Sequence, residues 1–157
     1  MNIKYNQEKS QDPSYGVIEI WDKSKLIFSI TGNIREFLEW VIFNRTLIIN
    51  ELFFFGNENC SLAQRMRIAR EIEFNDELDD NIVFDYWHGQ IFEYYKSHGL
   101  TFALRGFDNL DIIIGKNLKQ GEFSCYKDGK ELLRYKFDLD AFFHEVEIRY
   151  KEIEKEM

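Results

Sequence analysis

The stretch TGNIREFLEWVIFNRTLIINELFFF, from Thr31 to Phe55, is the one segment apolar and long enough to run through a folded domain. Asn33 can cap a helix through its side-chain oxygen, and Glu36 follows three residues later, where its carboxylate can reach back to the cap amide. Gly56 is a helix-stop signal. The stretch therefore predicts a long helix, of roughly 33 Å at 1.5 Å per residue.

Two apolar faces run along this predicted helix at helical spacing. The first comprises Ile34, Phe37, Leu38, Val41, Ile48, Ile49, Leu52 and Phe55, and the second comprises Trp40, Phe43, Leu47 and Phe54. A helix with so little polar surface is expected to be nearly buried. We therefore expect a central helix. The alternative is two helices, because the Asn44-Arg45-Thr46 triplet has poor helix propensity.

The rest of the chain predicts an α+β fold with one antiparallel sheet of about six strands, two N-terminal and four C-terminal. Residues 1–15 are polar and are expected to form a loose lead-in. Asp128-Gly129 between β-rich runs is a strong hairpin signal. The predicted strands are 17–21, 26–30, 100–104, 110–114, 122–126 and 131–137. The other predicted helices are 62–74, 90–97 ended by Gly99, and one capped by Asp138, while 81–87 is ambiguous and 151–157 is expected to fray.

Length and composition narrow the class of protein. A chain of 157 residues predicts a single domain, and 45% hydrophobic with 17% aromatic residues suffices for a core without disulfides or metal. The net charge of -8 argues against binding nucleic acid or an anionic membrane. There is no signal-peptide pattern and no membrane-spanning run, so a cytoplasmic protein with two unlinked thiols, Cys60 and Cys125, is expected.

Two segments partly match known catalytic or cofactor-binding motifs, but each lacks a required residue. Gly115-Lys116 lacks the hydroxyl residue and the second glycine of a phosphate loop, and His144-Glu145 lacks the second histidine of a helical zinc motif. Arg65, Arg67 and Arg70 are expected to lie mostly outside, as a solvated face paired with nearby acids. We therefore expect no catalytic residues, no metal and no cofactor.

Acidic and aromatic residues gather between positions 71 and 88. Seven acids occur there without an intervening Lys or Arg, next to two rings and an imidazole. Acids around aromatic anchors suit a site that grips a basic protein partner, although the same residues also fit a solvated loop leading into core aromatics. The candidate partner-binding residues are Glu71, Glu73, Asp76, Glu77, Asp79, Asp80, Asp85, Tyr86, Trp87 and His88.

Several segments together resemble a known class of protein. They are Phe28–Ile34, the 31–55 stretch, Phe84–His88, the Gly121–Cys125 run and the closing Phe137–Leu139. In style they are similar to small cytoplasmic immunity proteins of bacterial polymorphic-toxin and contact-dependent growth inhibition systems. The resemblance implies tight binding to one cognate toxin domain, possibly a basic nuclease, whose active-site cleft would be blocked. Two other hypotheses are an enzyme with an unrecognised site and a non-catalytic regulatory or structural module.

Overall fold

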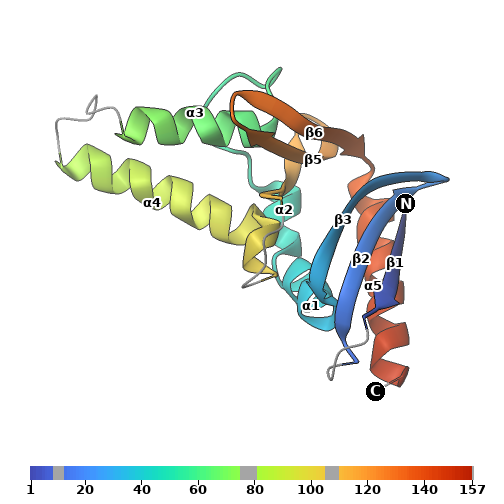
Figure 1. Ribbon diagram of the computed structural model, residues 1–157. Helices are drawn as coiled ribbons and strands as arrows, with labels where there is room; N and C mark the ends of the chain where they lie inside the picture. The colour runs from blue at the N-terminus through green and yellow to red at the C-terminus, as the bar shows by residue number, and fades with distance from the viewer. Residues whose placement is uncertain (9–12, 75–80, 105–109, 157) are drawn as a thin grey trace.

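The computed structural model describes residues 1–8, 13–74, 81–104 and 110–156. Within these ranges the protein is α+β, with two three-stranded antiparallel sheets, five α-helices and one 3-10 turn. The predicted fold class is confirmed at this level. The strands do not form a single sheet, as the sequence suggested, but are divided equally between two (Figure 1).

The first sheet has the order β1-β2-β3, from strands β1 (Asn2–Gln7), β2 (Tyr15–Asp22) and β3 (Lys25–Asn33). β1 lies inside the expected loose lead-in, which is therefore wrong for these residues. Ile3 is fully buried, whereas the alternate residues of β1 face outward. An edge strand with one solvated face reads as polar, which is why its sequence did not reveal it.

The 31–55 stretch does not form a central helix. α1 (Ile34–Phe43) begins where predicted, because Asn33 Oδ1 accepts a hydrogen bond of 3.1 Å from the Glu36 amide. α1 ends at Asn44, whose side chain donates to the Trp40 carbonyl over 2.9 Å. α2 (Arg45–Asn50) follows, and the chain becomes extended at Glu51. The alternative of two helices divided at the polar triplet is thus the observed one, since the Asn44 side chain bonds a backbone carbonyl one turn earlier.

The second sheet has the order β4-β5-β6, from β4 (Ile113–Asn117), β5 (Gln120–Lys127) and β6 (Lys130–Phe137). Asp128 and Gly129 form the β5–β6 turn at φ values of 51° and 74°, which confirms the predicted hairpin. The strand expected at 100–104 is instead the 3-10 turn η1 (Leu100–Phe102). Ala103 and Leu104 continue as buried packing residues rather than as strand.

Three further helices complete the fold. α3 (Leu62–Phe74) and α4 (Asn81–His98) lie side by side and project as an arm from the body, which Figure 1 shows on the left. α5 (Leu139–Glu156) packs on α1 and β1, and it is capped by Asp138, whose Oδ1 accepts from the Ala141 amide at 2.9 Å. Its helix continues to Glu156 instead of fraying from 151. None of the helices in the described ranges is long and apolar enough to cross a membrane.

Two hydrophobic clusters hold these parts together. The larger one joins both sheets to α1, α2 and α5, with the ring of Phe28 from β3 meeting Phe123 from β5 edge-on at 5.0 Å. The smaller one lies at the base of the arm, among α3, α4 and β4, and is centred on Phe53, Met66, Ile91 and Tyr94. This cluster packs the root of the arm against the second sheet.

Candidate partner-binding site

Of the acids predicted for partner binding, the structure describes Glu71, Glu73 and Asp85, and the first two of these are paired within the protein. Glu71 accepts a hydrogen bond of 2.9 Å from Arg67 Nε, one turn earlier on α3. Its charge is therefore compensated, as expected for a self-paired helix face. Asp76, Glu77, Asp79 and Asp80 lie outside the described residues.

Glu73 and Trp87 serve the interior of the arm. The Glu73 side chain is buried, and its Oε1 is bonded to His88 Nδ1. The Trp87 indole is half-buried, donates from Nε1 to the Ala69 carbonyl at 3.0 Å, and packs edge-on against Phe54 and Phe55. These two residues therefore join α3 to α4 and present little to a partner. Asp85, His88 and Tyr86, which is 66% exposed, remain on the surface.

Arg65 departs from the expected outer position. It is buried at the root of the arm, where Nη2 donates to the Phe53 carbonyl at 2.6 Å and Nε to the Phe55 carbonyl at 2.8 Å. It holds the extended segment after α2 against α3. A buried guanidinium with backbone acceptors is a structural clamp rather than a phosphate site.

A buried carboxylate anchors the start of α3. Glu122 on β5 is fully buried, and its two oxygens accept three hydrogen bonds. The donors are the Leu62 amide at 2.7 Å, Asn117 Nδ2 at 3.0 Å and Arg134 Nε at 3.1 Å. Ser124 Oγ accepts from the next amide, that of Ala63, at 3.0 Å. A negative group at a helix N-terminus satisfies amides that the helix itself cannot, so this cluster serves folding.

His98 and Tyr94 form a second buried polar group at the C-terminal end of α4. Their rings stack with centroids 3.8 Å apart. Burial lowers the pKa of His98 to about 4, although the backbone carbonyls of Tyr94 and Leu47 oppose the shift. Tyr94 Oη and His98 Nε2 have no partner in hydrogen-bonding geometry among the described residues. Both rings are sealed from solvent, so they are poorly placed to reach a substrate.

The described His, Cys, Asp and Glu side chains are spread through the fold. Among the described residues, no three His, Cys, Asp or Glu side chains come together in a group that could hold a metal ion. The two described cysteines, Cys60 and Cys125, are free thiols, and burial raises the pKa of Cys125. A thiol with a raised pKa is a weaker nucleophile at neutral pH, because less of it is thiolate.

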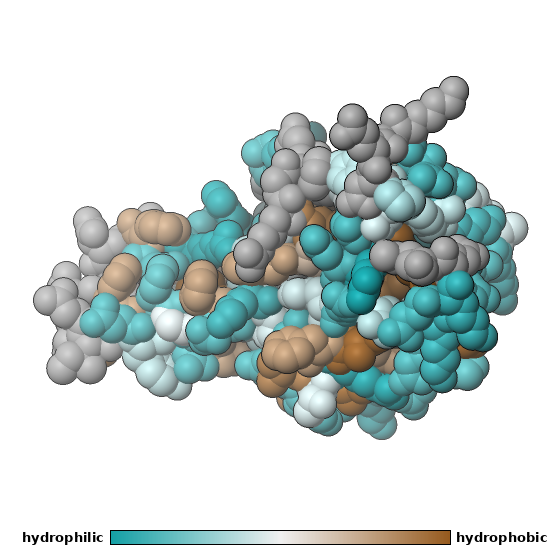
Figure 2. Space-filling view, turned by 90° about the horizontal axis from the view of Figure 1, so that it is seen from below, coloured by the Kyte–Doolittle hydropathy of each residue, from teal (hydrophilic) through white to brown (hydrophobic). Residues whose placement is uncertain are grey.

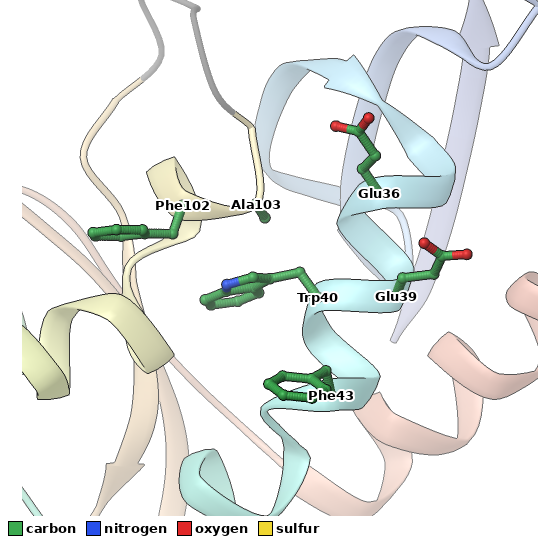
Figure 3. Close-up of a pocket in the computed structure, with 6 residues that line it drawn as sticks. All are labelled: Glu36, Glu39, Trp40, Phe43, Phe102 and Ala103. Atoms are coloured by element: carbon green, nitrogen blue, oxygen red, sulfur yellow. The ribbon is translucent and has the colours of Figure 1, made fainter.

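A hollow with aromatic walls lies between α1 and η1. It encloses about 600 Å³ and is lined by Glu36, Glu39, Trp40, Phe43, Phe102 and Ala103. In Figure 3 the rings of Trp40 and Phe43 project from α1 toward Phe102, whereas the two carboxylates project from other sides of the helix. Below, these six residues are called the α1–η1 pocket.

The α1–η1 pocket combines exposed rings with acidic neighbours. The Phe43 side chain is 86% exposed, although large rings at helical spacing are usually core residues. The Glu39 carboxylate accepts a hydrogen bond of 2.8 Å from Arg35 Nε. The Glu36 carboxylate has no ion pair among the described residues. An exposed ring that the fold does not use, flanked by acid, fits a contact with a basic partner.

Sequence reasoning missed this pocket for a definite reason. Trp40, Phe43 and Leu47 formed the second apolar face of the predicted helix, and that face was expected to be buried. In the structure Phe43 and Leu47 are exposed, because α1 and α2 are covered on one side only. A helix with two apolar faces is itself the signal, since one of them is left over for another contact.

Comparison with protein-family models, with curated proteins and with solved structures finds no significant match to this chain. The geometry of the α1–η1 pocket and of the surfaces beside it therefore carries the functional argument.

Proposed function

We propose that this chain is a protein-binding domain, and that its role is to neutralise a toxin domain in the cytoplasm by covering the toxin's active-site cleft. The observation that carries the proposal is the α1–η1 pocket, where Phe43 is 86% exposed beside Trp40 and beside Glu36, which has no ion pair among the described residues. The resemblance to immunity proteins supplies the class of partner.

Two physical features support the proposal. An aromatic ring that projects from the surface can be desolvated by a pocket of the partner, which is how a few residues come to dominate the affinity of an interface. The net charge of -8 favours rapid encounter with a basic surface, such as the substrate cleft of a nuclease. Asp85 and Tyr86, the exposed remainder of the sequence-predicted surface, add to the same acidic and aromatic character.

The test is whether the gene immediately upstream encodes a toxin domain that this chain binds and inhibits. Phe43→Ala is expected to weaken the affinity about 30-fold, as for a buried aromatic anchor, and to release the inhibited toxin activity. The matched control is Leu132→Ala, which removes another exposed apolar side chain, on β6, and is expected to change the affinity less than about twofold.

The outcomes distinguish a wrong function from a wrong interface. No binding by the wild-type chain would refute the function itself. Binding that is insensitive to Phe43→Ala but weakened by Tyr86→Ala together with Asp85→Asn would move the interface to the sequence-predicted surface.

A further inference from the structure

A row of rings runs along α4 and ends at the α1–η1 pocket. Phe84 and His88 stack with centroids 5.9 Å apart at 12°, and His88 and Phe92 follow at 6.5 Å and 14°. Phe92 meets Phe102, a lining residue of the pocket, at 6.3 Å. We call Phe84, His88, Phe92 and Phe102 the ring ladder. It extends the aromatic surface of the pocket along the arm.

His88, the second ring of the ladder, is held in place by a residue of α3. His88 is held through Nδ1 by the buried carboxylate of Glu73 on α3. The imidazole itself stays exposed, with 58% of its side-chain area open. A ring that is held in place loses little conformational freedom when a partner covers it, which favours binding. Glu73 thus acts as a positioning residue for the ladder.

Gly89 lies beside the ladder on the outer side of α4. Among the described residues, no atom outside the neighbouring backbone of α4 lies within 4 Å of a Cβ built at this position, so packing in the described part of the protein does not require a glycine. A glycine inside a helix is less stable than an alanine. The absence of a side chain here leaves the surface of α4 open at a point where a partner can approach closely.

The residues one turn before and one turn after Gly89 are both acidic. Asp85 and Glu93 share the i, i+4 row with Gly89, and Asp85 has no ion pair among the described residues. Glu93 makes only a long pairing of 3.8 Å with Lys96. A row that lacks a side chain at its middle position lets a second helix approach closely and place its side-chain ridge there. Figure 2 looks onto this side, where apolar side chains recur along the arm and gather where it joins the body.

We propose that the outer face of α4 receives an α-helix of the protein partner. That helix crosses at Gly89, rests apolar side chains on Phe84 and Phe92, and directs Lys or Arg toward Asp85 and Glu93. The proposal rests on the protein-binding function proposed above and specifies its partner as a helix that is apolar on one face and basic at its flanks. Charge complementarity selects this occupant over a second, equally acidic copy of the chain.

The experiment measures binding of the protein encoded immediately upstream to the wild-type chain and to three variants of this chain. Gly89→Leu fills the crossing point and is expected to weaken binding at least about tenfold, since an overpacked contact costs well over 1 kcal/mol. Gln90→Leu places the same side chain at the adjacent position and is expected to leave the affinity within about twofold. Gly89→Ala is expected to raise the urea midpoint while weakening binding, which shows that the glycine serves the partner and not the fold.

Each outcome decides between the two proposals. If the wild-type chain fails to bind, both are overturned. If it binds, and Phe43→Ala weakens binding while Gly89→Leu behaves like Gln90→Leu, only the helix-docking inference is overturned. If sedimentation of the free chain reveals a concentration-dependent dimer that Gly89→Leu abolishes, the occupant of this face is a second copy and the inference is wrong. Circular dichroism of each variant verifies that the arm is folded.

Discussion

Glu122→Gln tests whether the buried carboxylate holds α3 to the second sheet. The substitution keeps the size of the side chain but replaces one oxygen acceptor with an amide donor. The Glu122 oxygens face donors only, namely the Leu62 amide, Asn117 Nδ2 and Arg134 Nε. A glutamine therefore leaves at least one donor facing another donor, whichever way its amide is turned.

The cost can be worked from these contacts. The glutamine oxygen does best in the position that faces Asn117 and Arg134, which sacrifices the bond of 2.7 Å to the Leu62 amide. Losing a buried bond to a charged group costs about 1.5 to 3 kcal/mol, and the helix N-terminus loses its compensating charge as well. Arg134 is 25% exposed, so water can solvate its guanidinium and limit the damage. We expect a loss of about 2 to 4 kcal/mol in the free energy of unfolding.

The assay is urea unfolding followed by tryptophan fluorescence. The control is Glu131→Gln on β6, an exposed glutamate for which a change within about 0.5 kcal/mol is expected. A loss below about 1 kcal/mol for Glu122→Gln, with an unchanged m-value, would refute the anchoring role, because desolvated donors could not then be left unpaired. Faster hydrogen exchange at the Leu62 amide should accompany the loss of stability.

Three further predictions concern the buried polar group around Gly115. Tyr94→Phe removes a buried hydroxyl without a partner, so the midpoint of unfolding should stay equal or rise, and a loss above about 1 kcal/mol would contradict this. Gly115→Ala places a Cβ 2.7 Å from Tyr94 Oη and should cost about 1 to 3 kcal/mol, part of which Tyr94→Phe should restore in the double variant. His98 has a pKa of about 4 in the folded protein against 6.5 when unfolded, so the unfolded chain binds the proton first and stability falls as pH drops. Between pH 7 and 5 this residue should remove about 2 kcal/mol, and His98→Gln should remove that part of the slope in urea titrations at the two pH values.

The fold could be predicted where signals are local. The Asp128-Gly129 hairpin needs residues with positive φ, and the caps at Asn33 and Asp138 need a side-chain acceptor three residues before an amide. These features depend on neighbours in sequence, and each appears where it was expected.

The sequence-based predictions were wrong where contacts between residues distant in sequence determine the secondary structure or the exposure of a side chain. β1 is a strand because β2 pairs with it, and α1 ends at Asn44 although the apolar pattern continues to Phe55. For the site, acid density pointed to residues 71–88, yet Glu73 faces His88 inside the arm and Arg67 pairs with Glu71. Composition cannot say which side of a helix meets another helix, so the exposed Phe43 and the open side of Gly89 became visible only in the structure.

The contact between β1 and α5 has a consequence for how the chain is made in a cell. The Ile3 amide donates to Glu145 at 3.2 Å, and the Ile3 carbonyl accepts from Arg149 at 3.0 Å, so the outer edge of β1 is contacted by residues synthesised 142 and 146 positions later. Until those residues leave the ribosome, the nascent sheet has an open edge that can pair with other chains. A chain truncated after Phe137 should therefore aggregate during expression.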